Sequence, residues 1–172
     1  MSVQLNKETL LDPPFTKDPP LKVNINAKTL GLVLAILSAI VLLFGVLALP
    51  VLFAASAVGA ALGVPVAQIF VLVLLGTVIS LLGTVLVAWG GYRMYREDRG
   101  GKALVIYGLA LHVVGGLVSA LGGLSASAIV GWIVGTAVTF CLYYLVVVSR
   151  FPGEAPLVPT SATPGPPQAP IR

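Results

Sequence analysis

The chain has 172 residues, of which 58% are hydrophobic and only 9% are charged. A soluble domain carries about 25% charged residues, so this composition excludes an ordinary water-soluble globular protein. The net charge of +4 does not indicate a nucleic-acid partner, because Lys and Arg also mark the cytoplasmic side of membrane proteins. The single cysteine, Cys141, excludes an intramolecular disulfide and a cysteine zinc cluster.

The charged residues are confined to three stretches of the chain: 7–28, 93–102 and 150–172. Between them lie two long segments, 29–92 and 103–149, that contain no Asp, Glu, Lys or Arg. Each segment is too apolar to form the core of a soluble domain of this size. This pattern predicts an integral membrane protein.

Residues 1–28 are polar and contain two Pro-Pro pairs, a composition that is typical of a flexible cytoplasmic leader. No apolar run begins near Met1, so we expect no cleavable signal peptide. At the other end of the chain, residues 151–172 are rich in proline. We expect this segment to be a disordered cytoplasmic tail, because repeated proline is incompatible with helix and sheet.

The membrane domain is predicted to cover residues 29–150 and to contain four helical spans. Each apolar run is long enough to cross about 30 Å of hydrocarbon as a helix. The predicted spans are about 29–50, 66–92, 103–123 and 127–149. Pro50 is expected to kink or end the first helix, and residues 51–65 form either a kinked extension or a segment at the outer face. Gly100 and Gly101 are expected to end the second helix.

The predicted fold is therefore an all-α membrane protein with four transmembrane helices in an antiparallel bundle of two hairpins, flanked by flexible Pro-rich termini. All ten Lys and Arg residues lie in the leader, in the central loop or in the tail. The positive-inside rule then places both termini in the cytoplasm. The layout of residues 29–150 resembles that of small four-span bacterial membrane proteins with a basic loop after the second span. This resemblance implies a bacterial inner membrane, and because it includes no motif it assigns no functional residue.

Small residues recur every four positions on three of the predicted helices. They are Gly76, Ser80 and Thr84; Gly115, Ser119 and Gly123; and Ser127, Gly131, Gly135 and Thr139. In lipid, such stripes allow the backbones of two helices to approach closely. We expect them to pack against the other helices of the chain, and the alternative is an oligomer or partner surface.

His112 is the one His, Lys, Arg, Asp or Glu within the predicted spans. A polar residue at this depth is a candidate functional residue. Its imidazole either forms a hydrogen bond with a neighbouring helix or ligates a haem or chlorophyll-type cofactor, for which nearby glycines would leave room. A bis-histidine haem site is excluded because the chain has no second histidine.

The central loop carries four basic residues: Arg93, Arg96, Arg99 and Lys102. Such a cluster sets the topology and contacts anionic lipid headgroups, and the alternative is a docking site for another subunit. Cys141 has no His, Asp or Glu near it in the sequence to activate it, so we expect no nucleophilic catalysis.

These observations indicate a non-catalytic protein, with membrane lipids and other membrane subunits or further copies of itself as partners. The leading hypothesis is a structural or accessory subunit that packs against itself or within a larger membrane complex. One alternative is an oligomeric transporter or pore for small solutes, although the spans lack the carboxylate that proton or cation transport usually requires. The other alternative is a subunit that holds haem or pigment through His112.

Overall fold

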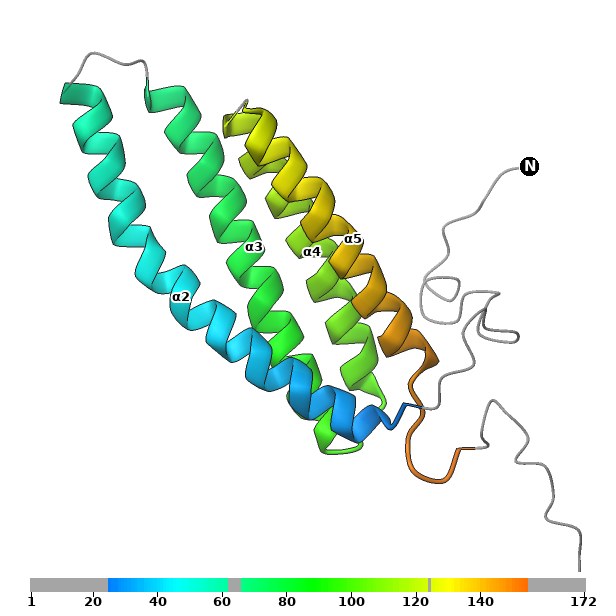
Figure 1. The fold of residues 1–172 in the computed structure, drawn as a ribbon. Coiled ribbons are helices and arrows are strands. Elements are labelled where there is room, and N and C mark those ends of the chain that lie inside the picture. Colours follow the sequence, from blue (N-terminus) through cyan, green and yellow to red (C-terminus); the bar gives the residue numbers. More distant parts are fainter. Residues whose placement is uncertain (1–24, 62–65, 124, 155–172) are drawn as a thin grey trace, which may run out of the picture.

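The computed structural model describes residues 25–61, 66–123 and 125–154, and these residues form four long helices (Figure 1). The helices are α2 (Ala27–Ala61), α3 (Val66–Tyr95), α4 (Gly100–Gly123) and α5 (Ala126–Val148). All four are long and apolar enough to cross a membrane. The predicted all-α fold of an integral membrane protein with four spans is thereby confirmed. Residues 1–24 and 155–172, which hold most of the predicted leader and tail, lie outside the described residues.

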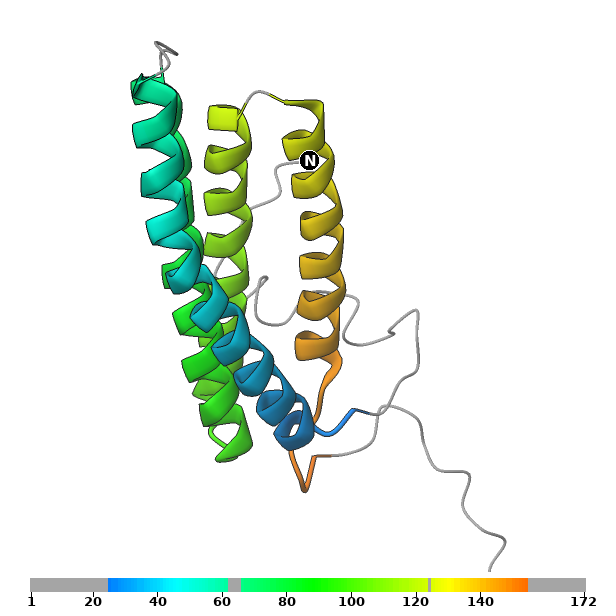
Figure 2. The same cartoon turned by 60° about the vertical axis from the view of Figure 1, so that its left-hand side comes forward.

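The first helix is longer than the sequence predicted, because it does not end at Pro50. Helix α2 continues without interruption from Ala27 to Ala61, with Pro50 inside it. Proline removes one backbone hydrogen bond and bends a helix, and α2 changes direction along its length (Figure 2). The part of the predicted outer segment that the structure describes is therefore a kinked extension of the helix.

The turn between α3 and α4 also differs from the prediction, because Gly100 and Gly101 begin α4 and do not end α3. Helix α3 ends at Tyr95, and Glu97 then adopts a positive φ of 64°. The carboxylate of Asp98 accepts a hydrogen bond of 2.8 Å from the backbone N–H of Gly100. An acidic side chain in this position caps the start of a helix, which explains why the glycine pair is helical.

Helices α3 and α4 pack together through glycines that recur every seven residues on both helices. The pairs are Gly76 with Gly115, Gly83 with Gly108, and Gly90 with Gly101. A Cβ atom added to Gly83 would lie 2.6 Å from the carbonyl oxygen of Gly108, and the reverse distance is also 2.6 Å. The two backbones are thus in direct contact at intervals of two helical turns. A seven-residue period is that of helix pairs with a left-handed crossing.

Helix α2 packs on α3 through another pair of glycines. A Cβ atom added to Gly31 would lie 2.6 Å from the carbonyl oxygen of Gly91. Helix α5, in contrast, contacts mainly α4, and the contact between them is much smaller than that between α3 and α4. Trp132 anchors it by donating a hydrogen bond of 3.1 Å to the carbonyl oxygen of Val113. The four helices therefore form an open bundle.

Helices α2 and α5 meet at one end of the bundle, which we call the charged end (residues 25–28, 93–102 and 149–154). The backbone N–H of Ala27 donates to the carbonyl oxygen of Arg150 at 2.7 Å, and the N–H of Arg150 donates to the carbonyl oxygen of Ile25 at 2.9 Å. Toward the opposite, uncharged end the two helices diverge (Figures 1 and 2). The pair therefore resembles a V whose apex lies near the charged end.

The main hydrophobic core also lies near the charged end. Its buried members come from all four helices and from the segment after α5, and they include Ala27, Met94, Val105, Val146 and Phe151. Phe151 is only 6% exposed, and Glu154 accepts a hydrogen bond from its backbone N–H. The first residues of the predicted disordered tail are thus part of the folded domain. Away from this core, the outward faces of the helices expose large apolar side chains, as expected for surfaces that contact lipid.

Candidate functional site

Three of the four basic residues of the central loop have partners within the chain. The Nε atom of Arg93 donates to Asp98 at 2.8 Å, Arg99 pairs with Glu154 at 3.5 Å, and the ammonium group of Lys102 donates to the carbonyl oxygen of Ser149. Among the described residues, the side chain of Arg96 forms no ion pair or hydrogen bond, and it is exposed. The loop therefore joins the ends of the helices, and this leaves Arg96 as its candidate for contact with lipid or a partner.

The ion pair between Arg93 and Asp98 also affects the charge of the turn. The hydrogen bond from Arg93 and the one from the N–H of Gly100 lower the pKa of the Asp98 carboxyl below its ordinary value. Because the pKa of Asp98 is lower in the folded protein than in the unfolded chain, its ionised carboxyl stabilises the fold at pH values above the unfolded-state pKa. This contribution is lost as the pH falls through the folded-state pKa. The turn therefore keeps its cap throughout the neutral and mildly acidic range.

The small-residue stripes on α3 and α4 are brought together by the structure. Gly76 and Ser80 lie against Gly115 and Ser119, with the Ser119 hydroxyl 3.3 Å from the carbonyl oxygen of Val73. Other hydroxyls on these helices bond within the bundle. Thr77 donates to Val73, Thr84 donates to Ser80, and Ser80 lies 3.5 Å from the carbonyl oxygen of His112. These hydroxyls serve helix packing, an arrangement that does not favour a polar path for solutes.

The stripe on α5 does not pack as expected. A Cβ atom added to Gly131 or to Gly135 would have no described atom within 4 Å, and both glycines are exposed. Ser127 is exposed as well, whereas Thr139 is buried. Gly123 at the end of α4 approaches only Ala128, with a distance of 3.4 Å for an added Cβ. The prediction of close packing failed on α5 because the bulky Trp132 holds this helix away from α4.

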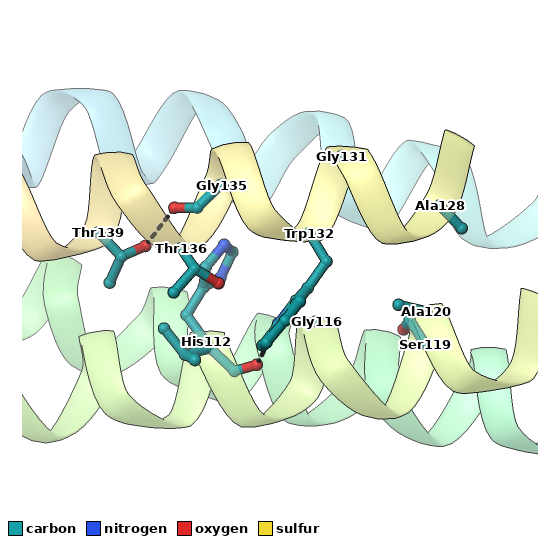
Figure 3. Close-up of a pocket in the computed structure, with 11 residues that line it drawn as sticks. His112, Gly116, Ser119, Ala120, Ala128, Gly131, Trp132, Gly135, Thr136 and Thr139 are labelled. Atoms are coloured by element: carbon teal, nitrogen blue, oxygen red, sulfur yellow. Dashed lines mark hydrogen bonds between the residues drawn. The ribbon is translucent and has the colours of Figure 1, made fainter. Parts of the chain in front are cut away.

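The open side of α5 is part of a cleft that has two parts, which we call the outer and inner parts. The outer part lies between α4 and α5, has a volume of about 270 Å³ and is lined by small residues that include Gly116, Ala120, Gly131 and Gly135. Figure 3 shows Trp132 extending across it toward α4. The Oγ1 atom of Thr136 is buried here and has no hydrogen-bond partner among the described residues.

The inner part of the cleft lies between the two arms of the V, on the membrane side of its apex, and has a volume of about 400 Å³. All four helices line it, and each contributes one polar side chain: Ser38, Thr84, His112 and Thr139. The remaining lining residues, apart from Gly135, are Leu and Val. At a rise of about 1.5 Å per residue, the four polar residues lie roughly 14–18 Å from the charged ends of their helices. They therefore form one polar layer, close to the middle of a membrane about 30 Å thick.

His112 belongs to both parts of the cleft. Its side chain is exposed, and its imidazole forms no hydrogen bond with the described residues, unlike the expected bond to a neighbouring helix. A haem needs cationic partners for its propionates in addition to an imidazole for its iron, and the polar layer contains no cationic side chain. Within the described ranges, no three His, Cys, Asp or Glu residues are close enough to hold a metal ion. The residues of the cleft therefore fit a neutral ligand better than a haem.

Cys141 is exposed on α5 and has no catalytic neighbour in the part of the chain that the structure describes.

Comparisons with protein families, with curated proteins and with solved structures gave no match to this chain. The candidate site therefore rests on the geometry of the cleft alone.

Sequence reasoning identified His112 but missed Ser38, which lines the inner part of the cleft together with it. Ser38 is one of two serines in a long apolar helix, the other being Ser56, and isolated serines are common in membrane spans. The available signal was its depth, because Ser38 lies eleven residues after the start of α2 and His112 lies twelve residues after the start of α4. This similarity in depth becomes informative only in the folded protein, where the contact between the beginning of α2 and the end of α5 brings both residues to the same cleft.

Proposed function

We propose that this protein is a non-catalytic membrane subunit that packs against another transmembrane chain through the outer part of its cleft. One observation carries this proposal: Gly131 and Gly135 face no other backbone. In contrast, at each paired glycine of the α3–α4 and α2–α3 contacts, an added Cβ would lie 2.5–2.8 Å from a backbone oxygen of the neighbouring helix. Because small residues four apart are a typical helix-docking face in lipid, the pair on α5 fits a helix from another chain.

A second feature of the outer part supports the same proposal. The hydroxyl of Thr136 is buried without a partner, and an unsatisfied hydroxyl is costly in an apolar medium. A backbone carbonyl or polar side chain on a docked helix would satisfy it. The partner is either a second copy of this chain or a different membrane protein.

Leucine substitutions at the open glycines test this function. We expect Gly131→Leu and Gly135→Leu to leave the thermal stability of the isolated protein in detergent unchanged, because an added Cβ has no described neighbour within 4 Å at either position. The same changes should abolish the co-purification of the partner, or the dimer if the partner is a second copy. Mass spectrometry of the protein purified in mild detergent detects a co-purified partner, and light scattering of the same sample detects the dimer. The proposal is wrong if both variants retain the assembly of the unmodified protein.

For the same membrane, we propose an orientation in which the charged end faces the cytoplasm of a bacterial cell. Its support is the concentration of Lys and Arg at this end. We expect reporter fusions at residue 98 and at the C-terminus to give a cytoplasmic signal, and a fusion at residue 60 to give a periplasmic one. A periplasmic signal at residue 98 would reverse the orientation.

A further inference from the structure

The inner part of the cleft has the properties of a binding site for a small ligand. Its volume of about 400 Å³ falls within the range of about 300–1,000 Å³ that is common for ligand sites. Its lining is mostly Leu and Val, with the polar layer as the exception. Sites for small molecules are typically apolar with a few convergent polar groups, and in helical bundles they lie between helices.

Two members of the polar layer have side chains without a partner. Thr84 and Thr139 donate to carbonyl oxygens of their own helices at 2.9 and 2.8 Å, which is the usual arrangement in apolar helices. Ser38 is only 8% exposed and lines the cleft, yet its hydroxyl forms no hydrogen bond with the described residues. The imidazole of His112 is exposed, and it also forms no hydrogen bond with the described residues. Polar groups without partners are costly in hydrocarbon, so these two side chains require an occupant that bonds to them.

The chemistry of the layer restricts what this occupant is. A charged headgroup is excluded, because residues 29–92 and 103–149 contain no Asp, Glu, Lys or Arg to neutralise it and an unpaired buried charge is very costly. A plain acyl chain has no atom that would bond to Ser38 or His112. A helix that crosses the whole membrane does not fit, because the backbone bonds between Ala27 and Arg150 close the apex of the V. The remaining class is a neutral head group with oxygen atoms on an apolar chain.

We propose that the inner part of the cleft binds a lipid-soluble molecule of the quinone class, with its head group between Ser38 and His112. A serine hydroxyl and an imidazole N–H each donate a hydrogen bond, and a quinone has two carbonyl oxygens that accept. The apolar chain of the molecule leaves between α2 and α5, which diverge toward the uncharged end (Figures 1 and 2). An isoprenoid alcohol has similar solubility but only one oxygen, which would have to lie within hydrogen-bond distance of both donors at once to accept from both.

The test is a titration of the purified full-length protein in detergent with decylubiquinone, in which saturable binding is measured by equilibrium dialysis. We expect Ser38→Ala and His112→Leu each to weaken binding about 5- to 10-fold, the value of one neutral hydrogen bond. His112→Gln retains a donor and should stay within about 2-fold of the unmodified protein. Ser56→Ala is the matched control, because Ser56 lies on the same helix but donates to the carbonyl oxygen of Phe53. This control should bind as the unmodified protein does.

Competition separates the possible ligand sources, and each variant is first required to elute as the unmodified protein does. We expect decanol to compete at least 10-fold more weakly than decylubiquinone, and decane not to compete. Equal competition by decanol would overturn the assignment to quinones, and equal competition by decane would overturn polar recognition altogether. The absence of saturable binding, or equal losses in Ser38→Ala and Ser56→Ala, would overturn the site. None of these outcomes depends on Gly131 or on a partner chain.

Discussion

Gly83→Ala is expected to destabilise the protein by about 3 kcal/mol, although it adds only one methyl group. The added carbon would lie 2.6 Å from the carbonyl oxygen of Gly108 and 2.9 Å from the backbone nitrogen of His112. Both are backbone atoms, which cannot rotate away as a side chain does, so α3 and α4 must separate along their length. We expect a clear fall in the midpoint of unfolding, measured by circular dichroism in detergent with increasing denaturant.

Gly131→Ala is the matched control, because it makes the same chemical change on a helix where the added carbon has no described neighbour within 4 Å. Alanine favours helix over glycine by up to about 1 kcal/mol, so this variant should be as stable as the unmodified protein or slightly more stable. If the two variants lose the same stability, the close contact between α3 and α4 is not what holds the bundle together.

Phe151→Ala is expected to cost about 3 to 4 kcal/mol, the usual loss when a buried phenylalanine is truncated. Phe151 is 6% exposed and packs in the core at the charged end, and its ring lies 5.4 Å from the ammonium group of Lys102. Its loss leaves a cavity among side chains from the helix ends. The free energy of unfolding in detergent measures this effect.

Phe44→Ala provides the comparison for Phe151→Ala, because Phe44 is 66% exposed on the outward face of α2. A side chain that contacts lipid in both the folded and the unfolded membrane protein contributes little to stability, so we expect a change within about 0.5 kcal/mol. If the loss of unfolding free energy in Phe151→Ala is as small as that expected for Phe44→Ala, residue 151 is not part of the folded domain.

The number of helices could be predicted from the sequence because charge and hydropathy alone decide which segments cross a membrane. The ends of the helices were less predictable. Pro50 and Gly100 usually break helices, but here the first is tolerated within a long helix and the second follows the cap at Asp98. Both outcomes depend on neighbours that a local rule does not include.

The packing was predicted in part. A spacing of four residues correctly suggested that Gly76 and Gly115 lie at a helix interface, but the same spacing at Gly131 and Gly135 did not produce contact within the chain. The spacing of seven that joins Gly76, Gly83 and Gly90 is the better indicator, because it keeps one face of a helix against its neighbour over many turns. The cleft itself was not predictable, since it depends on how α2 and α5 are joined at residues 26 and 150.

The bonds between Ala27 and Arg150 have a consequence for the order in which the protein is assembled during synthesis. Ribosomes add about 5 to 20 residues per second, so the beginning of α2 waits on the order of 10 s before Arg150 has been made. The hairpin of α3 and α4 is complete earlier and contains within itself the three glycine pairs that join these two helices. Nascent chains should therefore insert this hairpin as a stable unit, with α2 attached to it, and the last helix closes the charged end when translation is nearly finished.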